Sequence, residues 1–190
     1  MRLVVIGAHH GVGGLVVAQA RAAGHDVAPF EGDVLDAAAV ERAVVGRDAV
    51  ISTLGPRKDS VPDLCSRGTR HVVDAMRGRG IGRIIQITGA IIGHPYEKLG
   101  WVYRTIASFV PEAALADRRM QEQIVRDSGL RWTLLRPTRL TDGIARDTLR
   151  TGEQEQIGAF AHVSRASVAA FAVRALTDET TFGRAYTLQE

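Results

Sequence analysis

The chain has 190 residues, of which 45% are hydrophobic and 24% charged, and its formal net charge is +3. These values are ordinary for a soluble globular protein, and we expect residues 1–190 to form a single domain. No block of like charges and no long apolar run occurs, so neither a nucleic-acid partner nor a membrane partner is expected. The single cysteine excludes a disulfide framework, and the lack of a signal-peptide pattern favours a cytoplasmic location.

The first fourteen residues carry the strongest local signal. Residues 2–6 are a short apolar run that predicts a strand, residues 15–23 have helical spacing, and between them lies GAHHGVGG, residues 7–14. A strand, a glycine-rich turn and a helix together form a cradle for the pyrophosphate of a dinucleotide, because the helix N-terminus offers free N–H groups. The spacing is G-x-x-x-G-x-G instead of G-x-G-x-x-G. A glycine-rich turn without a ligand is the alternative, and the strand–helix context favours nucleotide binding.

Residues 25–30 are predicted to form the second strand, which Glu31 follows. This acid lies 24 residues after Gly7 (31 − 7). An acid about 20 residues past the turn can accept the ribose hydroxyls of NAD, although a solvated loop acid is an equal alternative. Residues 36–45 are predicted to form a short helix capped by Asp36.

Residues 48–54 read as a buried strand, and residues 55–59 form the loop at its carboxyl end. Ligands of open α/β sheets bind beyond the carboxyl ends of the strands. We therefore expect Thr53, Leu54, Gly55 and Arg57 to face a crevice. Arg57 could contact a phosphate or stack on a flat ring, and a plain surface arginine is the alternative.

The second half of the chain continues the alternation of helices and strands. Thr88 stands at the end of a strand and could orient a substrate or the nicotinamide carboxamide. Residues 91–112 suggest a loop with irregular helix, residues 138–143 another crevice loop, and residues 144–157 lack a clear periodicity. Helices are predicted at 62–77, 113–128 and 164–175, and strands at 83–88, 131–136, 160–163 and 185–188. This order implies an α/β fold with a doubly wound, mainly parallel, Rossmann-like sheet.

With these stretches in place, the chain resembles the NAD(P)H-binding subfamily of the atypical short-chain dehydrogenases/reductases, and within it the biliverdin-IXβ reductase/flavin reductase type. The resemblance rests on residues 7–14, 32–35, 48–59 and 129–143, with support from 163–165 and 186–187. It implies NADPH or NADH as the cofactor. It also implies a cofactor crevice made by Gly7, His9, His10, Gly11, Val12, Gly13, Asp33, Val34, Leu54, Gly55, Arg57, Thr88 and Pro137. Glu31, Thr53 and Thr138 complete the candidate cofactor-binding set.

Three departures from the family pattern change these expectations. The family usually has Thr-Gly at the positions of His9 and His10, and often a serine at the position of Gly89. It also usually has an arginine after strand 2, then a further helix and strand, whereas residues 30–33 here read FEGD. The sheet should therefore be shortened around strands 2–3. The anchor for the 2′-phosphate of NADP is missing, and the exposed edge could pair in a homodimer.

The sequence lacks the Tyr-x-x-x-Lys pair with which many relatives protonate a carbonyl. Tyr96 is followed by Lys98, and Tyr103 by Ala107, so both are predicted to be lid or core tyrosines. Hydride transfer without a side-chain acid suits a flavin, a quinone or a similar conjugated acceptor, which water can protonate.

Three residues are the catalytic candidates for such a reaction, Arg57, Thr88 and Arg139, with the two arginines aiding a developing anion. The six histidines have no metal-ligand spacing, and no metal is expected. Asp117 is predicted to be a solvated helix acid. Two hypotheses follow: an NAD(P)H-dependent reductase with a small-molecule acceptor, or a non-catalytic dinucleotide-binding redox sensor or scaffold.

Overall fold

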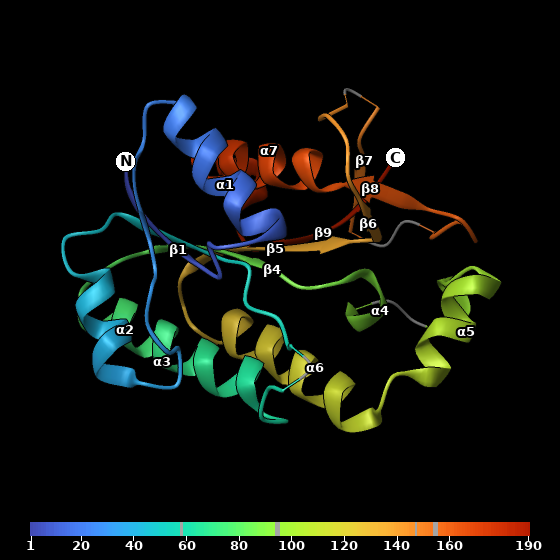
Figure 1. Ribbon diagram of the computed structural model, residues 1–190, viewed down its shortest axis with the longest axis horizontal. Coiled ribbons are helices and arrows are strands. Elements are labelled where there is room, and N and C mark those ends of the chain that lie inside the picture. Colours follow the sequence, from blue (N-terminus) through green and yellow to red (C-terminus); the bar gives the residue numbers. More distant parts are fainter. Residues whose placement is uncertain (58, 94–95, 147, 154–155) are drawn as a thin grey trace.

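A seven-stranded sheet forms the centre of the computed structural model, which describes residues 1–57, 59–93, 96–146, 148–153 and 156–190 (Figure 1). All neighbouring strands are parallel except the last pair, which is antiparallel. In spatial order the strands are β2 (Asp26–Pro29), β1 (Arg2–Ile6), β3 (Ala49–Ser52), β4 (Arg83–Ile87), β5 (Arg131–Pro137), β9 (Arg184–Gln189) and β7 (Arg150–Gly152). The predicted doubly wound, mainly parallel sheet is confirmed.

Helices cover both faces of this sheet (Figure 1). On one face lie α1 (Gly11–Ala22) and α7 (Arg165–Ala175), and on the other lie α2 (Ala37–Val44), α3 (Leu64–Gly78) and α6 (Glu112–Arg126). Side chains alternate between the two faces along each strand. Leu3 and Val5 accordingly join one apolar core with α1 and α7, while Val4 and Ile6 join the other.

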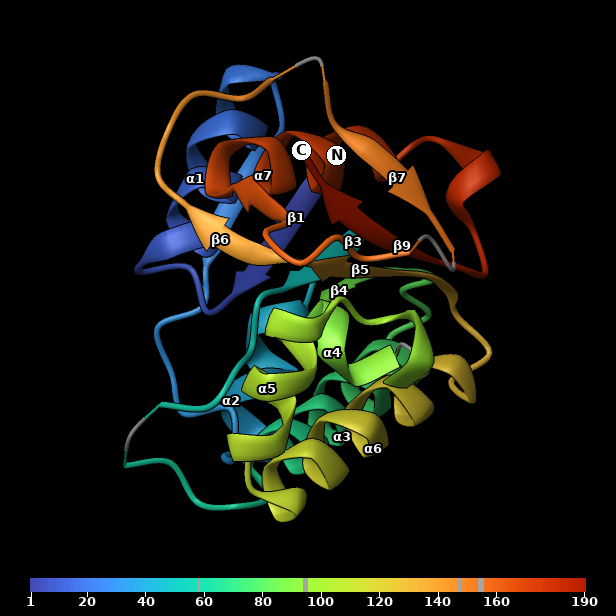
Figure 2. The same cartoon turned by 90° about the vertical axis from the view of Figure 1, so that its right-hand side faces the viewer.

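Smaller elements gather at the carboxyl ends of the strands, at the end of the molecule that faces the viewer in Figure 2. One group comprises α4 (Ala90–Gly93), the 3-10 turn Tyr96–Lys98 and α5 (Trp101–Phe109). The other is a separate parallel pair, β6 (Arg139–Thr141) and β8 (His162–Ser164). A last 3-10 turn, Glu179–Thr181, precedes β9.

The connection between β2 and β3 is short, as the sequence predicted. It contains only the loop after Pro29 and α2, whose N-terminus is capped by Asp36 Oδ1 accepting from the backbone N–H groups of Ala38 and Ala39. Because the chain then returns to pair beside β1, β2 is left as the edge strand of the sheet.

Several sequence expectations are wrong in detail. The first helix begins at Gly11, not at residue 15, because three of the four glycines of the predicted turn belong to its first turns. Residues 144–157 contain β7, and residues 138–143 contain β6, strands too short to show an alternating pattern. Residues 91–112 include the regular helix α5.

Asp117 is not a solvated acid. Its two carboxylate oxygens accept from the backbone N–H groups of Cys65 and Ser66, at 3.0 and 2.8 Å. These groups lie in the first turn of α3, where N–H groups have no partner inside the helix. A side chain of α6 therefore caps α3, a role that no local sequence pattern could reveal.

Candidate functional site

A cavity of about 720 Å³ lies beyond the carboxyl ends of β1, β3, β4 and β5. All the sequence-predicted site residues except Thr138 and Arg139 line it. They are Gly7, His9, His10, Gly11, Val12, Gly13, Glu31, Asp33, Val34, Thr53, Leu54, Gly55, Arg57, Thr88 and Pro137. The residues that sequence reasoning omitted are mainly apolar or cationic: Ile6, Phe30, Gly32, Pro56, Ser60, Leu64, Ile87, Arg118, Leu140 and Arg165.

Thr138 and Arg139 lie outside this lining. The Thr138 hydroxyl is buried and donates to the backbone carbonyl of Leu188, at 3.0 Å. Arg139 begins β6, and its backbone N–H donates to the Tyr103 hydroxyl, at 2.8 Å. Tyr103 is itself 5% exposed, so it is a core tyrosine, as expected.

The glycine-rich turn is held by Thr53 and closed by Gly13. The Thr53 hydroxyl lies 3.1 Å from the carbonyl oxygen of Ile6 and 3.0 Å from that of Gly7. Gly7 has φ +77°, a conformation that favours glycine. A Cβ on Gly13 would lie 2.1 Å from the Gly7 carbonyl oxygen, far inside van der Waals contact. Only glycine at position 13 allows α1 to pack this closely on the turn.

The N-terminus of α1 is open toward the cavity. His10 occupies the N-cap position in an extended conformation, and its side chain makes no capping hydrogen bond. The first turn of α1 contains no acidic residue. Free N–H groups at the positive end of a helix dipole attract anions. The uncapped helix and the glycine cradle therefore fit the pyrophosphate of a dinucleotide.

The far side of the cavity is formed by the loop after β2. Asp33 Oδ1 accepts from the backbone N–H of Leu35 at 2.9 Å, and so shapes this loop. Glu31 is exposed and lines the cavity two residues after Pro29. Glu31 therefore borders the cavity, so a hydrogen bond from a ribose hydroxyl to Glu31 stays a prediction.

Three arginines line the cavity, but they differ in their contacts. Arg118 Nη1 donates to the carbonyl of Leu54 at 2.7 Å and to the Gln121 amide oxygen at 2.8 Å. Arg57 lies in the loop after β3, as predicted. Arg165 comes from the start of α7. Sequence reasoning assigned it no role at the site, and residues 163–165 only supported the family resemblance.

A buried ion pair lies beneath Thr88. The Thr88 hydroxyl donates to Glu122 Oε1 at 2.7 Å, and the guanidinium of Arg136 binds both oxygens of the same carboxylate. The side chains of Arg136 and Glu122 are 8% and 6% exposed. Since an ionised carboxylate can only accept, the Thr88 hydroxyl must be the donor in its hydrogen bond with Glu122. Its oxygen is then available to a ligand as an acceptor.

No group of histidine, cysteine, aspartate and glutamate side chains in the described ranges could hold a metal ion. In the same ranges, no helix combines the length and the apolar character that crossing a membrane requires.

A doubly wound sheet with an open helix N-terminus and a glycine cradle at its switch point defines a dinucleotide-binding protein of the Rossmann class. Residues 7–179 match the model of the NAD(P)H-binding family. The chain therefore belongs to this family, and its cofactor is NAD(P)H.

Solved structures share the fold over nearly the whole chain. ChuY, an anaerobilin reductase from Escherichia coli O157:H7, is 24% identical, with a TM-score of 0.81 and coverage of 99% of this chain and 96% of that one. A short-chain dehydrogenase/reductase from Veillonella parvula DSM 2008 in complex with NADP is 18% identical, with a TM-score of 0.81 and coverage of 100% and 94%. The oxidoreductase ylbE from Lactococcus lactis is 14% identical, with a TM-score of 0.82 and coverage of 99% and 90%.

Proposed function

We propose that this protein transfers a hydride from NAD(P)H to a flavin, a quinone or a similar conjugated small molecule. The observation that carries the proposal is how two hydroxyl groups, those of Thr88 and Tyr103, are hydrogen-bonded. The Thr88 hydroxyl donates its hydrogen bond to Glu122, and Tyr103 is buried with its hydroxyl bound to backbone groups. Neither can act as the proton donor that carbonyl reduction needs.

When bound, the dinucleotide would supply the hydride, and the chain's own residues would hold and orient it. The α1 N-terminus and the glycine cradle bind the pyrophosphate, and Glu31 accepts from a ribose hydroxyl. The Thr88 oxygen accepts from the nicotinamide carboxamide. Arg57 stabilises negative charge as it develops on the acceptor, which water then protonates. Arg139 lies outside the cavity lining, so Arg57 is favoured over Arg139 for this role.

The acceptor belongs next to the apolar part of the lining. Ile87, Pro137 and Leu140 all line the cavity near Thr88. Apolar walls with few polar groups are typical of pockets for flat conjugated molecules. A neighbour in fold is described as an anaerobilin reductase, which is compatible with such an acceptor. The lone buried Cys65 supports a cytoplasmic location for this chemistry.

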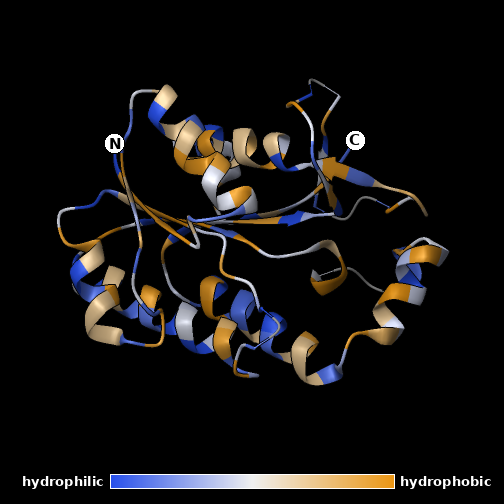
Figure 3. Ribbon diagram, in the orientation of Figure 1, coloured by the Kyte–Doolittle hydropathy of each residue, from blue (hydrophilic) through white to orange (hydrophobic). Residues whose placement is uncertain are grey.

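A second function is favoured by one surface. The side chains of Trp101, Ile106, Phe109 and Phe160 are exposed, by 66%, 44%, 82% and 74%. They belong to α5 and to the segment just before β8, and Figure 3 shows the hydrophobic stretches of α5 at the edge of the molecule. Exposed apolar patches often mark interaction sites. A dinucleotide-binding redox sensor or scaffold without turnover is therefore the alternative.

The two functions are separated by a turnover assay. Purified protein is mixed with NADH or NADPH and with riboflavin, FMN, a quinone or a linear tetrapyrrole, and the loss of nicotinamide absorbance is followed. We expect the protein to oxidise NADH or NADPH with at least one acceptor. Arg57→Gln should slow this reaction, whereas Arg174→Gln, at the far end of α7, should leave its rate unchanged. Cofactor binding without oxidation by any acceptor would overturn the reductase and leave the sensor.

A further inference from the structure

The start of α7 lies against the start of α1, although about 150 residues separate them in the chain. A Cβ on Gly11 would lie 3.8 Å from Arg165 Nε and 3.9 Å from its Cδ. Farther along α1, Gln19 Nε2 donates to the carbonyl of Ala166, the second residue of α7, at 3.2 Å. The guanidinium of Arg165 therefore lies beside the open N-terminus of α1.

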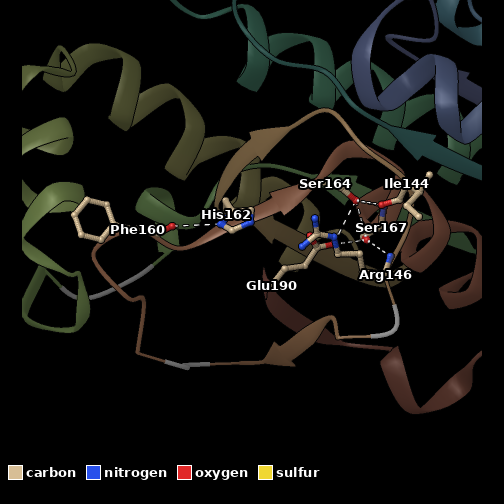
Figure 4. A network of polar contacts seen from close by, with 7 residues as sticks. All are labelled: Ile144, Arg146, Phe160, His162, Ser164, Ser167 and Glu190. Carbon is tan, nitrogen blue, oxygen red and sulfur yellow. Dashed lines mark hydrogen bonds and ion pairs between the residues drawn. The ribbon is translucent and has the colours of Figure 1, made fainter.

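The two helix starts differ in how their N–H groups are satisfied. At α7, the Ser164 hydroxyl accepts from the backbone N–H of Ser167 at 3.0 Å, and the Glu190 carboxylate, 2% exposed, accepts from the Ser167 hydroxyl (Figure 4). That N-terminus already has a side-chain cap and a nearby negative charge. The N-terminus of α1 has no side-chain cap and no acidic residue in its first turn. An anion that enters the cavity is therefore attracted to α1 and not to α7.

The network at the start of α7 also fixes the backbone from which Arg165 extends. Ser164 ends β8 and caps α7, and its hydroxyl also lies 3.1 Å from the carbonyl of Ile144 (Figure 4). Arg165 is the next residue along the chain. A side chain that extends from a fixed backbone loses less conformational freedom when it binds a ligand.

Arg165 now pairs with a carboxylate that a ligand can replace. Arg165 Nη1 lies 2.7 Å from Asp142 Oδ1, and the Asp142 side chain is 95% exposed whereas that of Arg165 is 30% exposed. An ion pair with one fully solvated partner contributes little to stability. A pyrophosphate held by the α1 N-terminus carries more negative charge and is fixed in position, so it competes well for the guanidinium.

We propose that Arg165 is a pyrophosphate-binding residue of the NAD(P)H site and that Asp142 holds its guanidinium until the cofactor replaces it. The inference rests on cofactor binding alone and not on the acceptor proposed above. It assigns a cofactor contact to α7, at the opposite end of the chain from the glycine-rich turn. It also gives Asp142 the role of a competitor for cofactor binding.

The test compares affinities for NADPH, NADH and ADP-ribose, measured by nicotinamide fluorescence and competition. We expect Arg165→Gln to weaken all three about tenfold or more, as loss of a charge-assisted hydrogen bond does. The affinity for adenosine, which has no phosphate, should change less than about twofold in this variant. Arg165→Lys should recover part of the loss, because lysine keeps the charge but not the planar fork. Arg174→Gln, which removes one charge from the same helix, should stay within about twofold.

The opposite substitution gives an independent result. Asp142→Asn should tighten NADPH binding by about two- to fivefold, because it releases Arg165 from its present partner. This variant changes an exposed side chain and keeps the test valid if Arg165→Gln fails to fold. The proposal is overturned if Arg165→Gln binds ADP-ribose as tightly as the parent protein does, or if its affinity for adenosine falls as much as its affinity for ADP-ribose. It is also overturned if Asp142→Asn leaves the affinity for NADPH unchanged. If the parent protein binds neither NADPH nor NADH, the cofactor site itself is overturned. If no acceptor is reduced in the turnover assay, the proposal for Arg165 is unaffected.

Discussion

At the scale of single residues, Glu122 and Arg136 form a buried ion pair next to the site. Each side chain is more than nine-tenths buried, and each is the charged partner of the other. Arg136 also donates to the carbonyl of Gly93, at 3.2 Å. A Cβ on Gly93 would lie 1.8 Å from the Arg136 guanidinium carbon, so the guanidinium fills the space beside this glycine. The pair thereby links β5, α6 and α4 beneath Thr88.

Breaking this pair should destabilise the protein strongly. Glu122→Gln keeps the shape of the side chain but leaves the buried charge of Arg136 without a counter-ion, and we expect a loss of about 3 kcal/mol or more in the free energy of unfolding. Glu112→Gln is the matched control on the same helix, because Glu112 pairs with Arg119 while 75% exposed. It should change the free energy of unfolding by less than about 1 kcal/mol. Urea denaturation measures both, and equal effects would contradict the prediction.

A second ion pair should make stability depend on pH. Asp48 accepts from the Arg2 guanidinium at 2.8 Å and from the Arg2 backbone N–H at 2.7 Å. These hydrogen bonds lower the pKa of Asp48 from its ordinary value of 3.8 to about 2. A lowered folded-state pKa gives stability that is present above the unfolded value and lost as the pH falls toward the folded one.

Asp48→Asn should therefore remove part of the acid sensitivity between about pH 4 and pH 2. The effect should be small, because the pair is solvated. Urea midpoints of the parent and the variant, measured at pH 6 and pH 3, give the comparison. The difference between the two proteins should shrink at the lower pH, and a difference that grows there would contradict the assigned role of Asp48.

At the scale of elements, the packing of α1 on the turn depends on one missing side chain. Gly13→Ala would place a methyl group against the Gly7 carbonyl and push the helix away from β1 and Thr53. We expect loss of NAD(P)H affinity of about tenfold or more, with a lower unfolding temperature.

Gly14→Ala is the control for this substitution, because its Cβ would lie an ordinary 3.5 Å from its nearest neighbour, the Ala8 carbonyl oxygen. It should bind the cofactor normally and should unfold at the same or a higher temperature, since alanine favours helix over glycine. Fluorescence titration and thermal unfolding measure both variants. Equal loss of affinity in the two would show that the cradle does not depend on position 13.

The elements that the sequence predicted well are those whose signal is local. The strand before Gly7, the helix cap at Asp36 and the turn residues can all be recognised within a few positions. Arg165 could not be assigned to the pyrophosphate in this way, because its role depends on α7 lying beside α1. The Glu122–Arg136 pair and the cap that Asp117 gives to α3 are likewise tertiary contacts between elements, and no periodicity predicts them.

At the scale of the whole molecule, the edge strand β2 is where a second copy could pair. Within the part of the chain that the structure describes, no strand neighbours its outer side in the sheet order. We predict a homodimer that forms through this edge, although Pro29 at its end limits the length of any pairing. Light scattering over a range of concentrations tests this, and we expect the mass of a dimer at high concentration. A monomer at every concentration would exclude pairing through β2.

The cofactor crevice combines residues from both ends of the chain, since α1 supplies the open helix N-terminus and α7 supplies Arg165. During synthesis on a ribosome, the turn and α1 emerge first, but α7 follows only after about 150 more residues. A partly made chain that ends before α7 would thus hold the turn and α1 but lack Arg165. We expect newly made protein to capture the dinucleotide only after nearly all of its length has left the exit tunnel.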